Sequence, residues 1–150
     1  MACLDWRLPP TESTGRERHI VNISLLCVFI AFLLIYLPKI PLSFAMAKSR
    51  GGYDNRHPRD QQAALEGWGR RAAAAHANGF ESFAPFAAAV LVAHVTKAEV
   101  QLTATLALVH VAARTVYPLV YIAGIHVLRS TVWVVGFAAT VGLFVVGIQV

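Results

Sequence analysis

IVNISLLCVFIAFLLIYL, residues 20–37, is the stretch that decides the fold. It carries no charged side chain, and a helix that crosses the hydrocarbon core of a bilayer needs about 20 predominantly apolar residues. The run is longer than the apolar part of a signal peptide and lacks a small-residue cleavage site, so we interpret it as a retained membrane span. Pro38, Lys39 and Pro41 follow, and they either end the span or let it continue as a kinked helix to about residue 47.

Three further apolar runs cover about 71–95, 100–122 and 127–150, which together with 20–47 gives four spans. A polar tail at 1–18 precedes this membrane domain at 19–150, and a polar loop at 48–70 joins the first two spans. Of the 150 residues, 57% are hydrophobic and 14% charged, whereas a soluble domain carries about 25% charged residues. The sequence therefore predicts an all-α integral membrane protein, a four-transmembrane-helix bundle with no room for a sizeable soluble catalytic domain.

The net charge of +5 reflects membrane topology rather than a nucleic-acid partner. Six of the 13 Lys and Arg residues lie in the 48–71 region, and three in the tail before the first span. Because short cytoplasmic loops carry an excess of Lys and Arg, we expect the long loop and the 123–129 turn to be cytoplasmic and both termini to be outside. Cys3 and Cys27 form neither a disulfide framework nor a metal-binding spacing, so no metal site is expected.

Two charged residues stand out deep inside predicted spans, Glu81 in the second and Arg114 in the third. A charge at the centre of a membrane helix costs about 2.5–3.5 kcal/mol, so such residues are usually paired or functional. At 1.5 Å of rise per residue, both lie about 15 Å from the loop end of their helices. The matched depth predicts that the two spans face each other and that Glu81 and Arg114 form a buried pair.

Helical phase adds neighbours to each charge. At about 100° per residue, Arg71 and Asn78 share a face with Glu81, and Tyr117 and Tyr121 share a face with Arg114. Arg129 and Ser130 begin the fourth span in the same cytoplasmic half. Polar pairs of this kind can simply hold helices together, but the number of cations and donors favours a wet, positively charged cavity for a small polyanionic ligand.

Two stretches share their pattern with a known family. They read RAAAAHANGFE at 71–81 and RTVYPLVY at 114–121, the second followed after a short turn by Arg129 and Ser130. They resemble the motifs of the MAPEG proteins, the membrane-associated proteins in eicosanoid and glutathione metabolism, and the likeness extends over nearly all of residues 19–150. The chain departs from the family motif at Arg70, which stands where the motif opens with Glu.

The resemblance implies a homotrimer of four-helix protomers that binds glutathione between neighbouring protomers near the cytoplasmic side. On the matching positions, Arg71, Asn78 and Glu81 would hold glutathione, Tyr117 and Tyr121 would line the site, and Arg114 would brace Glu81. Arg129 would stabilise the glutathione thiolate and Ser130 would donate a hydrogen bond to it. The 53–59 loop resembles a bacterial branch, which implies the inner membrane of a bacterium.

The expected activity is attack of glutathione on a hydrophobic electrophile from the bilayer, or reduction of a lipid hydroperoxide, by a transferase or peroxidase. Two other classes stay open. A non-catalytic lipid-binding or scaffold protein would use the polar stripes only to hold the assembly, and an oligomeric transporter would use them as an ion pathway. His94 and His110 are interpreted as packing residues and Trp133 as an interface aromatic.

Overall fold

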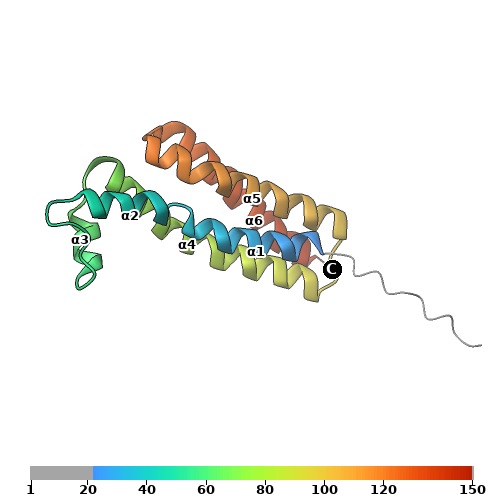
Figure 1. Cartoon of the computed structure of the whole chain (residues 1–150). Helices are drawn as coiled ribbons and strands as arrows, with labels where there is room; N and C mark the ends of the chain where they lie inside the picture. The colour runs from blue at the N-terminus through green and yellow to red at the C-terminus, as the bar shows by residue number, and fades with distance from the viewer. Residues whose placement is uncertain (1–21, 150) are drawn as a thin grey trace, which may run out of the picture.

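The computed structural model describes residues 22–149, and all of the regular structure in this part of the chain is helical. The described residues form six helices: α1 (Ile23–Tyr36), α2 (Lys39–Lys48), α3 (Pro58–Ala64), α4 (Gly67–Val95), α5 (Val100–Ala123) and α6 (His126–Ile148). α1 and α2 follow one another as a broken rod, and this rod, α4, α5 and α6 lie side by side (Figure 1). The polar loop with α3 projects at one end of the bundle, and the described part of the chain begins and ends at the other.

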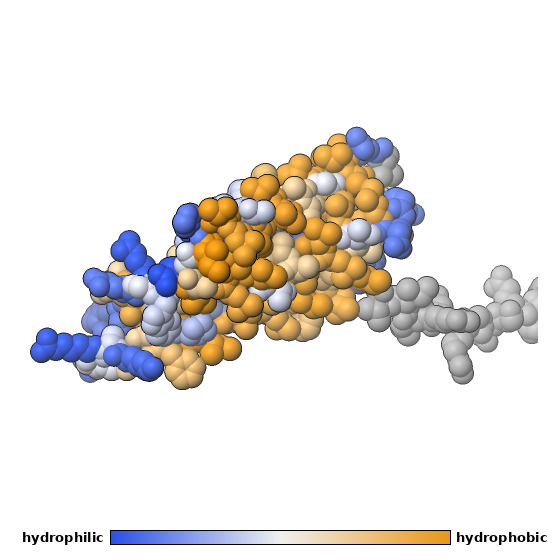
Figure 2. All heavy atoms as spheres, turned by 90° about the horizontal axis from the view of Figure 1, so that it is seen from above, coloured by the Kyte–Doolittle hydropathy of each residue, from blue (hydrophilic) through white to orange (hydrophobic). Residues whose placement is uncertain are grey.

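Three segments are long and apolar enough to cross a membrane: Ile23–Lys48, Val100–Ala123 and His126–Ile148. Exposed large apolar side chains such as Phe29, Phe44 and Phe137 cover the bundle. Figure 2 shows the resulting hydrophobic belt, with hydrophilic residues gathered toward the two ends of the bundle. An apolar surface of this extent is what an integral membrane protein presents to lipid.

α4 is long enough to span a bilayer, with 29 residues, but it is not among the helices apolar enough to do so. Its first half carries the polar residues that the sequence placed inside the second span, including Arg71, Asn78 and Glu81. The expected span at 71–95 is therefore helical, but its membrane location does not follow from its own composition.

The rod formed by α1 and α2 breaks at Pro38, as a kinked first helix would. Proline has no N–H for the helical hydrogen bond and its ring clashes with the preceding turn. His76 of α4 compensates at the break, because its Nδ1 donates to the Ile35 carbonyl at 2.8 Å. A histidine with no assigned role in the sequence thus bonds the backbone of a different helix.

α4 packs closely on the broken rod through small residues. Gly69, Ala72, Ala75 and Gly79 are all buried on the face of α4 that meets α1 and α2. A Cβ added at Gly69 would lie 2.8 Å from the Ala45 Cβ. Small residues at such positions let helix backbones approach closely in a membrane protein.

Candidate functional site

Asn78 links the two charges that the sequence placed at matched depth. Arg114 Nη1 donates to Asn78 Oδ1 at 3.0 Å, and Asn78 Nδ2 donates to Glu81 Oε2 at 3.0 Å. The expected direct pair of Glu81 and Arg114 is wrong, because no ion pair joins them among the described residues. The prediction that α4 and α5 face each other is confirmed, but the Asn78 amide lies between the Arg114 guanidinium and the Glu81 carboxylate.

The chain of contacts continues from Arg114 along α5 to α6. The Arg114 guanidinium carbon lies 4.4 Å from the centre of the Tyr117 ring, which meets the Tyr121 ring edge-on at 5.5 Å between centres. The Arg129 guanidinium carbon lies 4.7 Å from the Tyr121 ring centre. Both cations sit at distances typical of cation–π contacts. We call this series the polar ladder: Glu81, Asn78, Arg114, Tyr117, Tyr121 and Arg129.

Burial decreases toward both ends of the polar ladder. Arg114 and Tyr117 are 9% and 4% exposed, Asn78, Tyr121 and Arg129 are half-buried, and Glu81 is exposed. The guanidinium of Arg114 is therefore a fixed internal cation, whereas the Glu81 carboxylate and the Arg129 guanidinium are accessible from outside the bundle.

A cavity of about 170 Å³ opens beside the Glu81, Asn78 and Arg114 part of the ladder, where α4, α5 and α6 meet. Asn78, Glu81 and Arg114 provide its polar end. Trp133 and Phe137, whose rings stack at 5.1 Å, form an apolar wall on α6. One small space thus offers a cation, a carboxylate and an amide beside aromatic surface. This combination suits a ligand with charged groups at one end and a reaction partner that is apolar.

Two of the sequence-predicted site residues lie outside the polar ladder. Arg71 Nε donates to the Ile122 carbonyl at 2.8 Å, and its guanidinium lies against Gly124, which ends α5 with φ +80°. Ser130 is exposed and its hydroxyl donates to the His126 carbonyl at 3.1 Å. Arg71 therefore holds the turn between α5 and α6, a contact that its helical phase on α4 did not reveal.

The sequence assigned no functional role to two other residues near the site, Ser82 and His110, of which it interpreted His110 as a packing residue. Ser82 lines the cavity one residue after Glu81, and nothing in its neighbourhood along the chain distinguishes it from a packing serine. His110 lies one helical turn before Arg114, and this spacing of four residues is a signal that the two share a face. No group of His, Cys, Asp and Glu among the described residues could hold a metal ion.

Comparison with known proteins gives one result. The model of the MAPEG family matches residues 23–149, which is nearly all of the part that the structure describes. No curated protein and no solved structure matched the chain. The family match and the motifs at 71–81 and 114–121 agree, and the chain belongs to the MAPEG family.

Proposed function

We propose that this protein is a membrane-bound, glutathione-dependent transferase or peroxidase that acts on hydrophobic electrophiles or lipid hydroperoxides. The observation that carries the proposal is the cavity in which Asn78, Glu81 and Arg114 meet the aromatic wall of Trp133 and Phe137. Membership of a family of glutathione- and eicosanoid-related membrane proteins gives the class of cosubstrate.

The chemistry of glutathione fits the residues present. Its two carboxylates suit Arg114, because a guanidinium offers five N–H donors and only one is used by Asn78. Its ammonium group suits Glu81, which is exposed and accepts one hydrogen bond from Asn78. When bound, glutathione supplies the thiol sulfur that attacks the electrophile.

Arg129 is the residue we assign to the thiol. A cation near a thiol favours the thiolate, which is the nucleophilic form. The Arg129 guanidinium is half-buried against Tyr121, so it is held in place yet partly shielded from water, which strengthens its effect on a nearby anion. Ser130 is the second donor in this proposal, and its hydroxyl has to turn away from the His126 carbonyl to reach the sulfur.

The size of the cavity argues for a second copy of the chain. Pockets for small molecules usually measure about 300–1,000 Å³, and the cavity on one protomer measures about 170 Å³. Glu81 is also exposed on a single protomer, where direct contact with lipid would cost about 2.5–3.5 kcal/mol. We therefore propose that a homotrimer forms and that a neighbouring protomer completes the site.

The same proposal includes four spans, with α4 as the second. The described chain begins and ends at one end of the bundle, as an even number of crossings requires (Figure 1). The excess of Lys and Arg in the loop at 48–70 supports a cytoplasmic location for this loop, and the resemblance to a bacterial branch supports the inner membrane of a bacterium.

Calorimetry of glutathione binding to the detergent-purified protein tests the function. We expect saturable binding at millimolar glutathione or below, weakened at least tenfold by Arg129→Ala and by Glu81→Gln. Arg59→Ala, in the exposed loop helix α3, is the matched control and should bind like the wild type.

The alternatives give different results. Absence of binding at millimolar glutathione would rule out the proposed function. Copurified lipid, together with an Arg129→Ala variant that folds normally and loses no function, would favour a lipid-binding or scaffold protein. Proton flux in liposomes would favour an ion pathway.

A further inference from the structure

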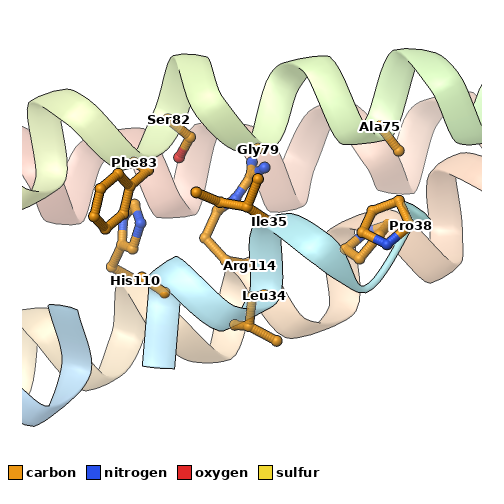
Figure 3. Close-up of a pocket in the computed structure, with 11 residues that line it drawn as sticks. Leu34, Ile35, Pro38, Ala75, Gly79, Ser82, Phe83, His110 and Arg114 are labelled. Atoms are coloured by element: carbon orange, nitrogen blue, oxygen red, sulfur yellow. The ribbon is translucent and has the colours of Figure 1, made fainter. Parts of the chain in front are cut away.

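A second cavity lies inside the bundle, between α1, α4 and α5, and it is separate from the space beside Trp133. Its volume of about 10 Å³ has room for about one water molecule. Most of its lining is apolar, but His110, Ser82 and Arg114 contribute polar atoms. Figure 3 shows Ser82 on α4 and His110 and Arg114 on α5, with their side chains turned into the space between the two helices.

His110, one of the residues that line this cavity, has a ring nitrogen without a hydrogen-bond partner. The side chain is 1% exposed and its ring stacks on Phe86 at 3.8 Å. Nδ1 lies 3.1 Å from the Gly136 carbonyl and 3.0 Å from the Thr140 hydroxyl. In the part of the chain that the structure describes, His110 Nε2 is the one buried side-chain nitrogen or oxygen without a hydrogen-bond partner.

The hydrogen bonds of His110 Nδ1 determine whether Nε2 acts as a donor or as an acceptor. A carbonyl only accepts, so the hydrogen bond to Gly136 places the hydrogen on Nδ1. On an uncharged imidazole, Nε2 is then an acceptor that needs a donor. Since a buried acceptor left unpaired loses its hydration without compensation, Nε2 requires a small donor, and His110 lines a cavity with room for about one water molecule.

Two further polar groups at this cavity lack their usual helical partners. Thr105, Thr115 and Thr131 donate to the carbonyl four residues earlier, whereas the Ser82 hydroxyl makes no hydrogen bond within the described residues. Pro118 also lines the cavity and has no N–H to offer the Arg114 carbonyl one turn before it. Ordered water commonly satisfies backbone groups that a proline frees in a membrane helix.

We propose that this interior cavity is a binding site for a single structural water that donates to His110 Nε2 and bonds to the Ser82 hydroxyl beside Arg114. An apolar occupant would leave Nε2 unpaired, and the available room excludes a larger polar ligand. Ser82 and Arg114 line both cavities. The water therefore extends the polar ladder from the outer cavity into the centre of the protomer. This inference does not depend on glutathione.

An experimental structure of the wild-type protein at about 2 Å, in lipid, tests the site. We expect one isolated density peak within hydrogen-bond distance of both His110 Nε2 and Ser82 Oγ. No peak where other buried waters are visible, a direct bond between Ser82 Oγ and Nε2, or an acyl chain in the cavity would each overturn the proposal.

Ser82→Ala and Ser43→Ala make a matched pair of variants. Ser43 is half-buried on α2, lines an outer groove and makes no hydrogen bond within the described residues. We expect Ser82→Ala to lose or weaken the peak and to lower the thermal midpoint by about 2–4 °C, the shift that one lost hydrogen bond gives in a protein of this size. Ser43→Ala should keep the peak and the midpoint. A density peak of full height in Ser82→Ala would contradict the assignment of Ser82, as would equal thermal midpoints of Ser82→Ala and Ser43→Ala. If Ser82→Ala does not fold, the presence or absence of the peak in the wild-type map decides whether the water site exists.

Discussion

Replacing Asn78 by leucine removes the group through which Arg114 and Glu81 interact. The variant keeps a side chain of similar size on α4 but offers Arg114 no acceptor, and Arg114 is only 9% exposed. A hydrogen bond to a charged group contributes about 1.5–3 kcal/mol. We expect Asn78→Leu to lower the free energy of unfolding by about that amount.

A double-mutant cycle isolates the contact itself. Hydrogen bonds between helices in a membrane average about 0.6 kcal/mol with a maximum near 1.7 kcal/mol, and charge-assisted bonds are about twice as strong as neutral ones. The 3.0 Å bond from Arg114 to Asn78 should therefore give Asn78→Leu and Arg114→Met a coupling energy of about 1–2 kcal/mol. Glu81→Gln and Arg114→Met should couple by less than about 0.5 kcal/mol, because Glu81 is exposed and makes no ion pair with Arg114.

Reversible unfolding in mixed micelles, followed by circular dichroism, measures the free energies of the four proteins in each cycle. Additivity of Asn78→Leu and Arg114→Met within about 0.5 kcal/mol would mean that the amide does not bond the guanidinium. A larger coupling of Arg114 with Glu81 than with Asn78 would restore the direct ion pair that the sequence suggested.

Three more predictions concern other parts of the fold. His76→Leu removes the donor to the Ile35 carbonyl and should destabilise the protein by about 1–2 kcal/mol, with a lower thermal midpoint than His57→Leu in the exposed loop. Gly124→Ala forces a side chain into φ +80° and should cost about 1–2 kcal/mol in the same assay. The backbone N–H groups of His57 and Arg56 lower the pKa of Asp54. The contribution of the Asp54 carboxylate to loop order is therefore present above about pH 4, and it is lost as the pH falls through the pKa that Asp54 has in the folded protein. The amide NMR shifts of the 54–57 turn should report this loss, and Asp54→Asn should abolish the pH dependence.

Much of the bundle follows from the sequence because apolar runs and helical phase are local properties. The run at 20–37, followed by Pro38, predicts a first span that either ends there or continues as a kinked helix, and the structure contains a broken rod. Phase also groups Asn78 with Glu81 and Tyr117 with Tyr121, and these pairs do meet.

The errors concern how far one helix is shifted along another. Opposite charges at similar depth suggested that Arg114 reaches Glu81, but a small axial offset brings Asn78 to the guanidinium instead. Arg71 shares the phase of Asn78 but lies about two turns nearer the loop, where the end of α5 is within reach. The contact of His76 depends on a break in a different helix, so no pattern within 71–81 reveals it.

The modest apolarity of α4 has a consequence for how the protein enters the membrane. In the four-span arrangement proposed above, α4 is the segment that the insertion machinery would release into lipid least readily, since it is not apolar enough by itself. The partner that bonds Asn78 lies on α5, which is synthesised later. We expect α4 to remain beside the translocon until α5 has been synthesised, so that the two helices enter the bilayer together as a helical hairpin. A chain truncated before Arg114 should leave α4 poorly inserted.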